Sequence, residues 1–227
     1  NGDFGTALAR HEDRVAEAAK ALGPTTDGPG APDPYTKAGG YFGAYKTVIA
    51  DTWFLFGRFC LRAAGSAAAR GDGASYLEYL GKGAECLGTA TVVDDAHVDA
   101  TRLCGAVLLE QGKYEKADAV LQKALDLETP PPLPSDDAER GDESLASPNP
   151  LSNVLMCLQR MATGAPVAAR SFLGYAVMGF NARGGVAPGK PKRTAVLLAV
   201  QAAEYLVESA LPGLAAQALD LADKAEA

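Results

Sequence analysis

Apolar residues recur along most of this chain at the three- and four-residue spacing of amphipathic helices, and period-two alternation is nearly absent. Breaks rich in glycine and proline divide the helical segments. The pattern predicts an N-terminal helix that ends at Gly23-Pro24, followed by four helical hairpins. We expect these hairpins at 41–69 with 74–87, about 95–111 with 114–127, 150–162 with a helix through 180, and 194–210 with a helix ending near 225. The fold class is therefore predicted to be all-α.

Long proline-rich segments interrupt this helical pattern. Residues 23–40 contain four prolines, and residues 129–150 contain six prolines together with five acidic residues and one arginine. We interpret 129–150 as an acidic insertion. The expected domain organisation is a helix plus loop over 1–40 and a helical repeat domain over 41–227. Within this domain, Asn149-Pro150 is a typical helix start, and Asp94 or Asp95 is expected to cap the helix that follows.

The second hairpin contains a characteristic order of small and large residues. In chain order these are Gly105, Leu108, Gly112, Tyr114, Ala117, Leu121 and Ala124. This order resembles the tetratricopeptide repeat, a pair of antiparallel helices with a period of about 34 residues. Small residues there let the two helices approach, whereas Leu108, Tyr114 and Leu121 fill the space between hairpins. The resemblance implies a right-handed α-solenoid of about four antiparallel hairpins, with an extra N-terminal helix and two long loops. Other α-solenoids, such as HEAT arrays, stay open as alternatives.

Members of this family typically bind other proteins in a concave groove that the first helix of each hairpin lines. The resemblance implies a groove in the second and fourth hairpins that contains Arg102, Leu109, Glu110, Leu197, Val200, Glu204 and Glu208. Some family members clamp a partner's C-terminal carboxylate with a cation and an asparagine one turn later. Ala106 stands at the asparagine position, so this kind of recognition is not expected.

Half of the aromatic residues lie within residues 35–59. Core packing explains Trp53 and Phe56, which recur at helical spacing. Tyr41, Phe42 and Tyr45 lie beside glycines instead, and we predict that they form an aromatic anchor for a partner.

Charge and cysteine content limit the classes of partner and compartment. The net charge is -7 and the sequence pI is near 4.9, so binding to a nucleic acid is not expected. No apolar run is long enough for a direct membrane span. The four cysteines are widely spaced, which favours reduced core thiols in a reducing compartment. The sequence begins at Asn1 rather than methionine, and removal of a targeting peptide is one explanation.

Candidate chemical motifs are weak. Gly184, Gly189 and Lys190 have the spacing of a phosphate-binding loop, but Pro191 replaces the required Ser/Thr and no strand is expected before them. The two histidines belong to no metal-binding motif, and no nucleophile elbow is present. We therefore expect no catalytic residue, metal or cofactor. The sequence favours a non-catalytic protein-interaction scaffold or adaptor. The alternatives are a structural subunit of a large organellar or membrane-associated complex and, less favoured, an enzyme or nucleotide-binding regulator.

Overall fold

A computed structural model describes residues 39–128, 149–182 and 191–226. This part of the chain consists of helices joined by short turns and contains no strand, which confirms the all-α prediction. The helices are α3 (Gly39–Ala69), α4 (Gly73–Val93), α5 (Val98–Glu110), α6 (Tyr114–Glu128), α7 (Pro150–Ala162), α8 (Pro166–Ala182), α9 (Pro191–Glu208) and α10 (Pro212–Glu226). The predicted N-terminal helix, and most of the proline-rich segments at 23–40, 129–150 and 184–192, lie outside the described residues.

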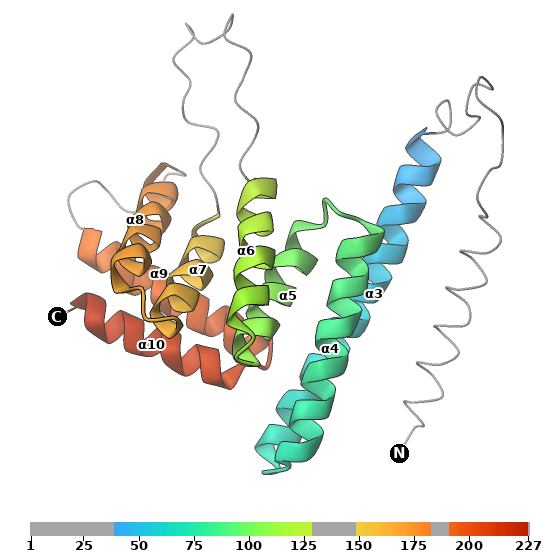
Figure 1. Cartoon of the computed structure of the whole chain (residues 1–227), viewed down its shortest axis with the longest axis horizontal. Coiled ribbons are helices and arrows are strands. Elements are labelled where there is room, and N and C mark those ends of the chain that lie inside the picture. The colour runs from blue at the N-terminus through green and yellow to red at the C-terminus, as the bar shows by residue number, and fades with distance from the viewer. Residues whose placement is uncertain (1–38, 129–148, 183–190, 227) are drawn as a thin grey trace, which may run out of the picture. The chain divides into compact units, whose positions relative to one another are not determined.

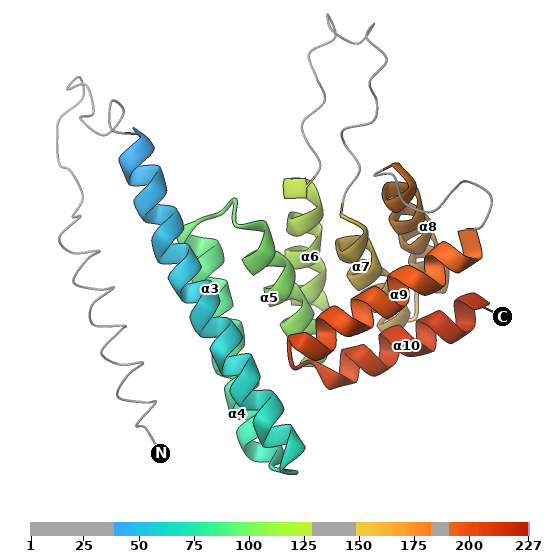
Figure 2. The same ribbon diagram turned by 180° about the vertical axis from the view of Figure 1, so that it is seen from behind.

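The chain divides into two compact units, residues 1–49 and 50–227. The described part of the first unit is the start of α3, and all that follows concerns the second unit. In that unit α5 pairs with α6, α7 with α8, and α9 with α10 (Figure 1). Consecutive hairpins meet through α4–α5, α6–α7 and α8–α9. The last hairpin also lies against earlier helices, because α10 contacts both α5 and α7 (Figure 2).

Two Gly-x-x-x-Leu segments form the seam between α3 and α4. A Cβ atom added to Gly57 would lie 2.7 Å from Leu87 Cγ, and one added to Gly83 would lie 2.8 Å from Leu61 Cδ2. Each leucine thus occupies the space that a side chain at the facing glycine would need. The glycines therefore set how closely the two helices approach.

The α5–α6 seam follows the same rule, as the sequence predicted for its small residues. A Cβ atom on Gly105 would lie 2.6 Å from Leu121 Cδ2. Ala117 and Ala124 are fully buried. Leu108 is half-buried against the core, whereas Tyr114 is 40% exposed and fills less of the space between hairpins than we expected.

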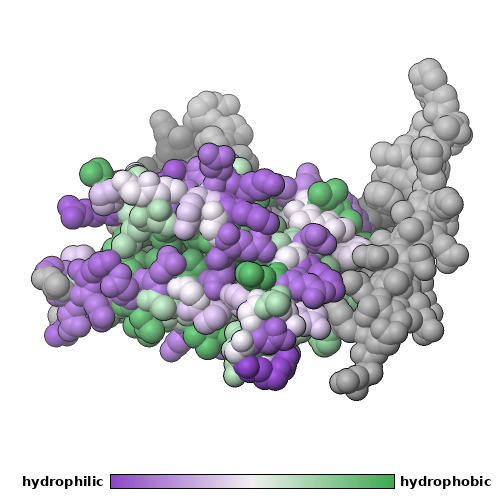
Figure 3. Space-filling view, turned by 60° about the horizontal axis from the view of Figure 1, so that its bottom comes forward, coloured by the Kyte–Doolittle hydropathy of each residue, from purple (hydrophilic) through white to green (hydrophobic). Residues whose placement is uncertain are grey.

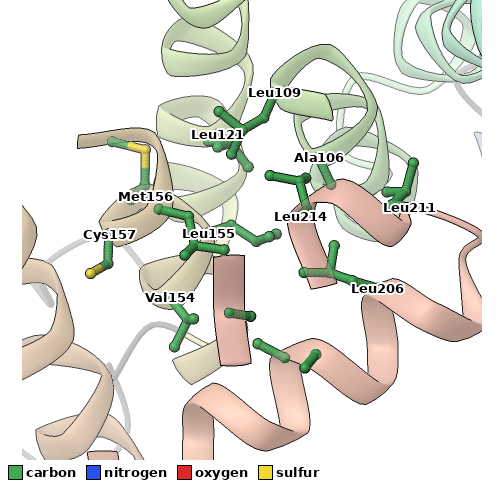
Figure 4. Packing of buried hydrophobic residues seen from close by; sticks show 14 of the residues in the cluster. Ala106, Leu109, Leu121, Val154, Leu155, Met156, Cys157, Leu206, Leu211 and Leu214 are labelled. Atoms are coloured by element: carbon green, nitrogen blue, oxygen red, sulfur yellow. The ribbon is translucent and has the colours of Figure 1, made fainter. Parts of the chain in front are cut away.

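The core lies where α5, α6, α7, α9 and α10 meet. Most residues of α5 and α7 are buried on all sides. Figure 4 shows labelled side chains of these helices close together: Ala106, Leu109, Leu121, Leu155, Leu206 and Leu214. Covering both helices in this way leaves little of their surface for a partner.

Local capping explains two of the helix starts. Asn149 begins α7 as predicted: its side-chain oxygen accepts a hydrogen bond from the backbone N–H of Leu151 at 3.0 Å, and Pro150 occupies the first turn. The expectation for α5 is wrong, because His97 caps it. Nδ1 of His97 accepts from the Ala100 backbone N–H at 3.2 Å, while Asp94 instead ends α4. The ring is held by Asp51, whose Oδ1 lies 3.1 Å from Nε2, and by packing on Phe54.

Candidate interaction surface on α7, α8 and α10

Helix α8 is apolar on both of its faces. Its 17 residues include one charged side chain, Arg170. The inner face buries Ala169, Ala176 and Val177, as expected for a helix packed on α7. The outer face exposes large apolar side chains as well: Val167 is 82% exposed, Tyr175 54% and Met178 67%. Because a surface helix normally turns polar residues to the solvent, this composition makes the outer face of α8 a candidate interaction surface.

An apolar pocket of about 250 Å³ lies beside α8, between the end of α7 and the end of α10. Its apolar lining includes Cys157, Met161, Ala169, Leu173, Leu221 and Ala225. Arg170 and Lys224 also line the pocket and are exposed to solvent. Figure 3 shows hydrophobic residues gathered between hydrophilic ones on the face that carries the C-terminal hairpins. None of Val167, Tyr175 and Met178 lines this pocket, and we call the row of these three exposed residues the α8 surface.

The pocket floor is chemically inert at neutral pH. Cys157 points away from the central leucine cluster, on the side of α7 that faces the pocket (Figure 4). Burial raises the pKa of the Cys157 thiol to about 11, so the thiol stays protonated and is a poor nucleophile. All four cysteines of the chain are buried and free. The pocket therefore offers shape and apolar contact rather than a reactive group.

Two arginines near the pocket have different surroundings. Arg160 is held in place, because it pairs with Asp118 of α6 at 2.7 Å and lies over the ring of Phe172. Arg170 forms no ion pair within the described part of the chain. Lys224 is paired with Asp220, one turn earlier on the exposed side of α10. Arg170 is thus a cation available to an incoming anion.

The α8 surface belongs to a basic stretch of an acidic protein. Residues 144–203 contain no aspartate or glutamate but six cations: Arg160, Arg170, Arg183, Lys190, Lys192 and Arg193. The whole chain has a net charge of -7. We did not predict this surface from the sequence, although the absence of acids and the single charge in α8 are signals that a reader of the sequence could have used.

Arg102, predicted to line a groove, is buried in a polar cluster. Its guanidinium donates to Ser152 Oγ at 2.9 Å, to Asp99 Oδ1 at 2.8 Å and to Glu128. Ser152 Oγ also donates to Glu128 Oε1 at 3.0 Å. Glu128 ends α6, and its carboxylate accepts a hydrogen bond from the backbone N–H of Asn149. The cluster therefore joins α5 to the end of α6 and to the start of α7. Arg102 therefore donates to three partners within the molecule.

Glu110, also predicted to line the groove, caps helix α10. Its carboxylate accepts hydrogen bonds from the backbone N–H groups of Gly213 at 3.0 Å and Leu214 at 2.6 Å, in the first turn of α10. Tyr76 donates its hydroxyl to the same carboxylate at 2.7 Å. Burial first, and then the hydrogen bond to Glu110, raise the pKa of Tyr76. Glu110 thus connects α4, α5 and α10.

The remaining predicted binding residues lie elsewhere. Leu109 is buried, at 3% exposed. The four residues on α9 are more accessible: Leu197, Glu204 and Glu208 are exposed, and Val200 is half-buried. They do not share an exposed surface with Arg102 and Leu109. Tyr41, Phe42 and Tyr45 fall in the first turns of α3, where the side chains lie outside the described part.

Comparisons with known proteins give no family for this chain. It matches no protein-family model, and neither the curated proteins nor the solved structures include a match. The resemblance to the tetratricopeptide repeat therefore stays a prediction. Among the described residues, no cluster of His, Cys, Asp and Glu could hold a metal ion. Within the same residues, no helix has the length and apolar character needed to span a membrane.

Proposed function

We propose that this protein is a non-catalytic interaction scaffold that binds another protein through the α8 surface. The main observation in support is that Val167, Tyr175 and Met178 are all exposed on one helix, which also borders an apolar pocket. Burying a large apolar side chain contributes about 1.5–3 kcal/mol, so the three together provide a substantial share of a binding free energy.

The proposal includes the architecture. We infer that the hairpins α3–α4, α5–α6 and α7–α8 are tetratricopeptide-like units of a right-handed solenoid. Sequential contacts between hairpins and the small residues at the α5–α6 seam support this inference. In this arrangement α9 and α10 occupy the face of α5 and α7 that would otherwise line a groove, which favours α8 over α5 as the binding helix.

A pair of matched substitutions tests the proposed function. Val167 and Val92 are both 82% exposed, but Val92 lies at the end of α4, outside the α8 surface. Tagged wild type, Val167→Glu and Val92→Glu are purified from cells of the source organism, and co-purifying proteins are quantified by mass spectrometry. We expect Val167→Glu to lose partners that Val92→Glu keeps. Retention of every partner by Val167→Glu, with unchanged circular dichroism, would refute the proposal.

Exposed apolar side chains on other helices favour the alternative of a subunit built into a large complex. Leu55 of α3 is 59% exposed and Leu77 of α4 is 64% exposed. We expect an obligate subunit to bury apolar side chains of several helices against its neighbouring subunits. Sizing at low and high salt distinguishes the two proposals: a subunit stays in a large particle in high salt, whereas a scaffold releases its partner.

A further inference from the structure

We propose that Cys60 of α3 and Cys86 of α4 form a redox-sensitive pair, which hydrogen peroxide converts to a disulfide that crosslinks the two helices. This inference does not depend on the α8 surface. Three observations support it: the position of the two cysteines in the helix seam, the contact between their sulfur atoms, and the different surroundings of the other two cysteines.

The sequence places the two cysteines at equivalent positions of the α3–α4 seam. Residues 57–61 of α3 and residues 83–87 of α4 share the pattern Gly-x-x-Cys-Leu. The leucine of each segment occupies the space beside the glycine of the other, so the contacts across the seam are reciprocal. The two segments are therefore related by a local two-fold arrangement, which places Cys60 across the seam from Cys86.

Glycines bring the two backbones close together beside the cysteines. The carbonyl oxygen of Gly83 lies 3.4 Å from the position of a Cβ atom added to Gly57, and the reciprocal distance is 3.5 Å. A disulfide requires the Cα atoms of its two cysteines to lie within about 7 Å of each other. Backbone contact one helical turn from each cysteine favours such a short separation.

The sulfur atoms of the pair are in contact. The thiol of Cys86 donates a hydrogen bond to Cys60 Sγ. This hydrogen bond and the positive charge of Lys82 lower the pKa of Cys60, although burial acts in the opposite direction. Both side chains are buried, Cys60 fully and Cys86 at 5% exposed. The lowered pKa suits Cys60 to the role of the attacking thiolate, with Cys86 as the thiol that resolves the intermediate.

The reaction needs no reagent other than hydrogen peroxide. The Cys60 thiolate attacks one peroxide oxygen, so that an S–O bond forms and the O–O bond breaks. The hydroxide that leaves takes up the proton that Cys60 released and becomes water. Sγ of Cys86 then attacks the sulfenic acid on Cys60: the S–S bond forms, the S–O bond breaks, and the hydroxyl leaves with the Cys86 proton as a second water. The two sulfurs lose two electrons, and the peroxide gains them.

The other two cysteines lack this arrangement. Cys104 of α5 and Cys157 of α7 are buried, and burial raises the pKa of each thiol to about 11. The Cys104 thiol donates instead to the backbone carbonyl of Ala84, at 4.0 Å. Because a protonated thiol is a poor nucleophile, we expect peroxide to leave both of these residues reduced while it oxidises Cys60 and Cys86. They serve as internal references.

Oxidation of the native chain followed by peptide mapping tests the pair. The full chain is reduced, treated with hydrogen peroxide, alkylated and digested with trypsin, and a urea-unfolded sample serves as the control for thiol reactivity. We expect a peptide pair linked through Cys60 and Cys86, alkylated Cys104 and Cys157, and loss of the link in dithiothreitol. If Cys60 and Cys86 stay reduced in the native sample, or form links equally with Cys104 or Cys157, the proposal is overturned.

Matched serine substitutions separate the crosslink from general oxidation. Cys60→Ser and Cys104→Ser each remove one buried thiol, but only Cys60→Ser removes a member of the pair. A disulfide between residues 60 and 86 closes a loop in the unfolded chain, so it should raise the melting temperature by about 5–10 °C. We expect peroxide to produce this rise in wild type and in Cys104→Ser, and dithiothreitol to reverse it. An equal rise in Cys60→Ser would overturn the assignment.

Discussion

Replacing Glu110 by alanine tests whether this side chain holds the last hairpin in place. Leu211 precedes α10 and has no side-chain acceptor, so the backbone N–H groups of Gly213 and Leu214 rely on Glu110 from α5. Gly213 makes this approach feasible, because a Cβ atom there would lie 2.7 Å from Glu110 Oε1. The substitution leaves the buried Leu214 without its acceptor and removes the partner of the Tyr76 hydroxyl.

The expected loss follows from these contacts. A hydrogen bond to a charged group contributes about 1.5–3 kcal/mol, and a negative charge at a helix N-terminus contributes about 0.3–1 kcal/mol. Water can replace part of the loss at exposed Gly213, so we expect Glu110→Ala to lower the free energy of unfolding by about 2–3 kcal/mol. For a unit of this size the melting temperature should fall by roughly 5–10 °C.

Urea unfolding followed by circular dichroism measures this loss. Glu85→Ala removes an exposed glutamate from the middle of α4 and serves as the control, within about 0.5 kcal/mol of wild type. A double-mutant cycle with Tyr76→Phe isolates the hydroxyl–carboxylate bond. If Glu110→Ala is as stable as Glu85→Ala, the cap is not formed in solution, and Glu110 returns as a candidate partner-binding residue.

Three further changes have expected directions. His97→Ala should lower the free energy of unfolding by about 1 kcal/mol, as measured by thermal unfolding. His97→Asn should lower it much less, because asparagine can also cap α5. Ala210 has φ 57, and Ala210→Gly should stabilise by about 1 kcal/mol in urea unfolding. Burial raises the pKa of Cys104 and Cys157 from 9.0 to about 11. The contribution of these buried thiols to the free energy of unfolding is therefore complete below pH 9. It is lost as the pH rises toward 11, because the thiols ionise first in the unfolded chain. Unfolding at pH 8 and 10.5 should detect a loss of up to about 2 kcal/mol per thiol, and the total loss should be smaller in Cys157→Ala.

Locally determined features of this fold could be predicted from the sequence. Helix α7 begins at Pro150 and ends at Ala162 as expected, because Asn149, Pro150 and the following turn at Gly164 are short-range signals. Gly112 likewise has φ +72 at the expected turn between α5 and α6. The small residues at the α5–α6 seam were also found, because the resemblance assigned them a packing role.

Contacts between residues distant in sequence determine the features of the fold that could not be predicted from the sequence. Aspartate is a preferred helix cap, yet His97 caps α5, because Asp51 and Phe54 from another helix fix its ring. Arg102 and Glu110 occupy positions that would face a groove in a simple array of hairpins. Their partners Glu128, Gly213 and Leu214 are distant in sequence, and no local pattern announces such contacts.

The position of the last hairpin explains why α8 is the exposed apolar helix. Helices α5 and α7 are apolar on most sides, and α9 and α10 provide the surfaces that bury them. Helix α8 has the same apolar composition on both faces, but its outer row at Val167, Tyr175 and Met178 has no such cover within the described part of the chain. An outer row with the composition of a buried face, exposed within the described part of the chain, supports the proposal that a partner protein covers it.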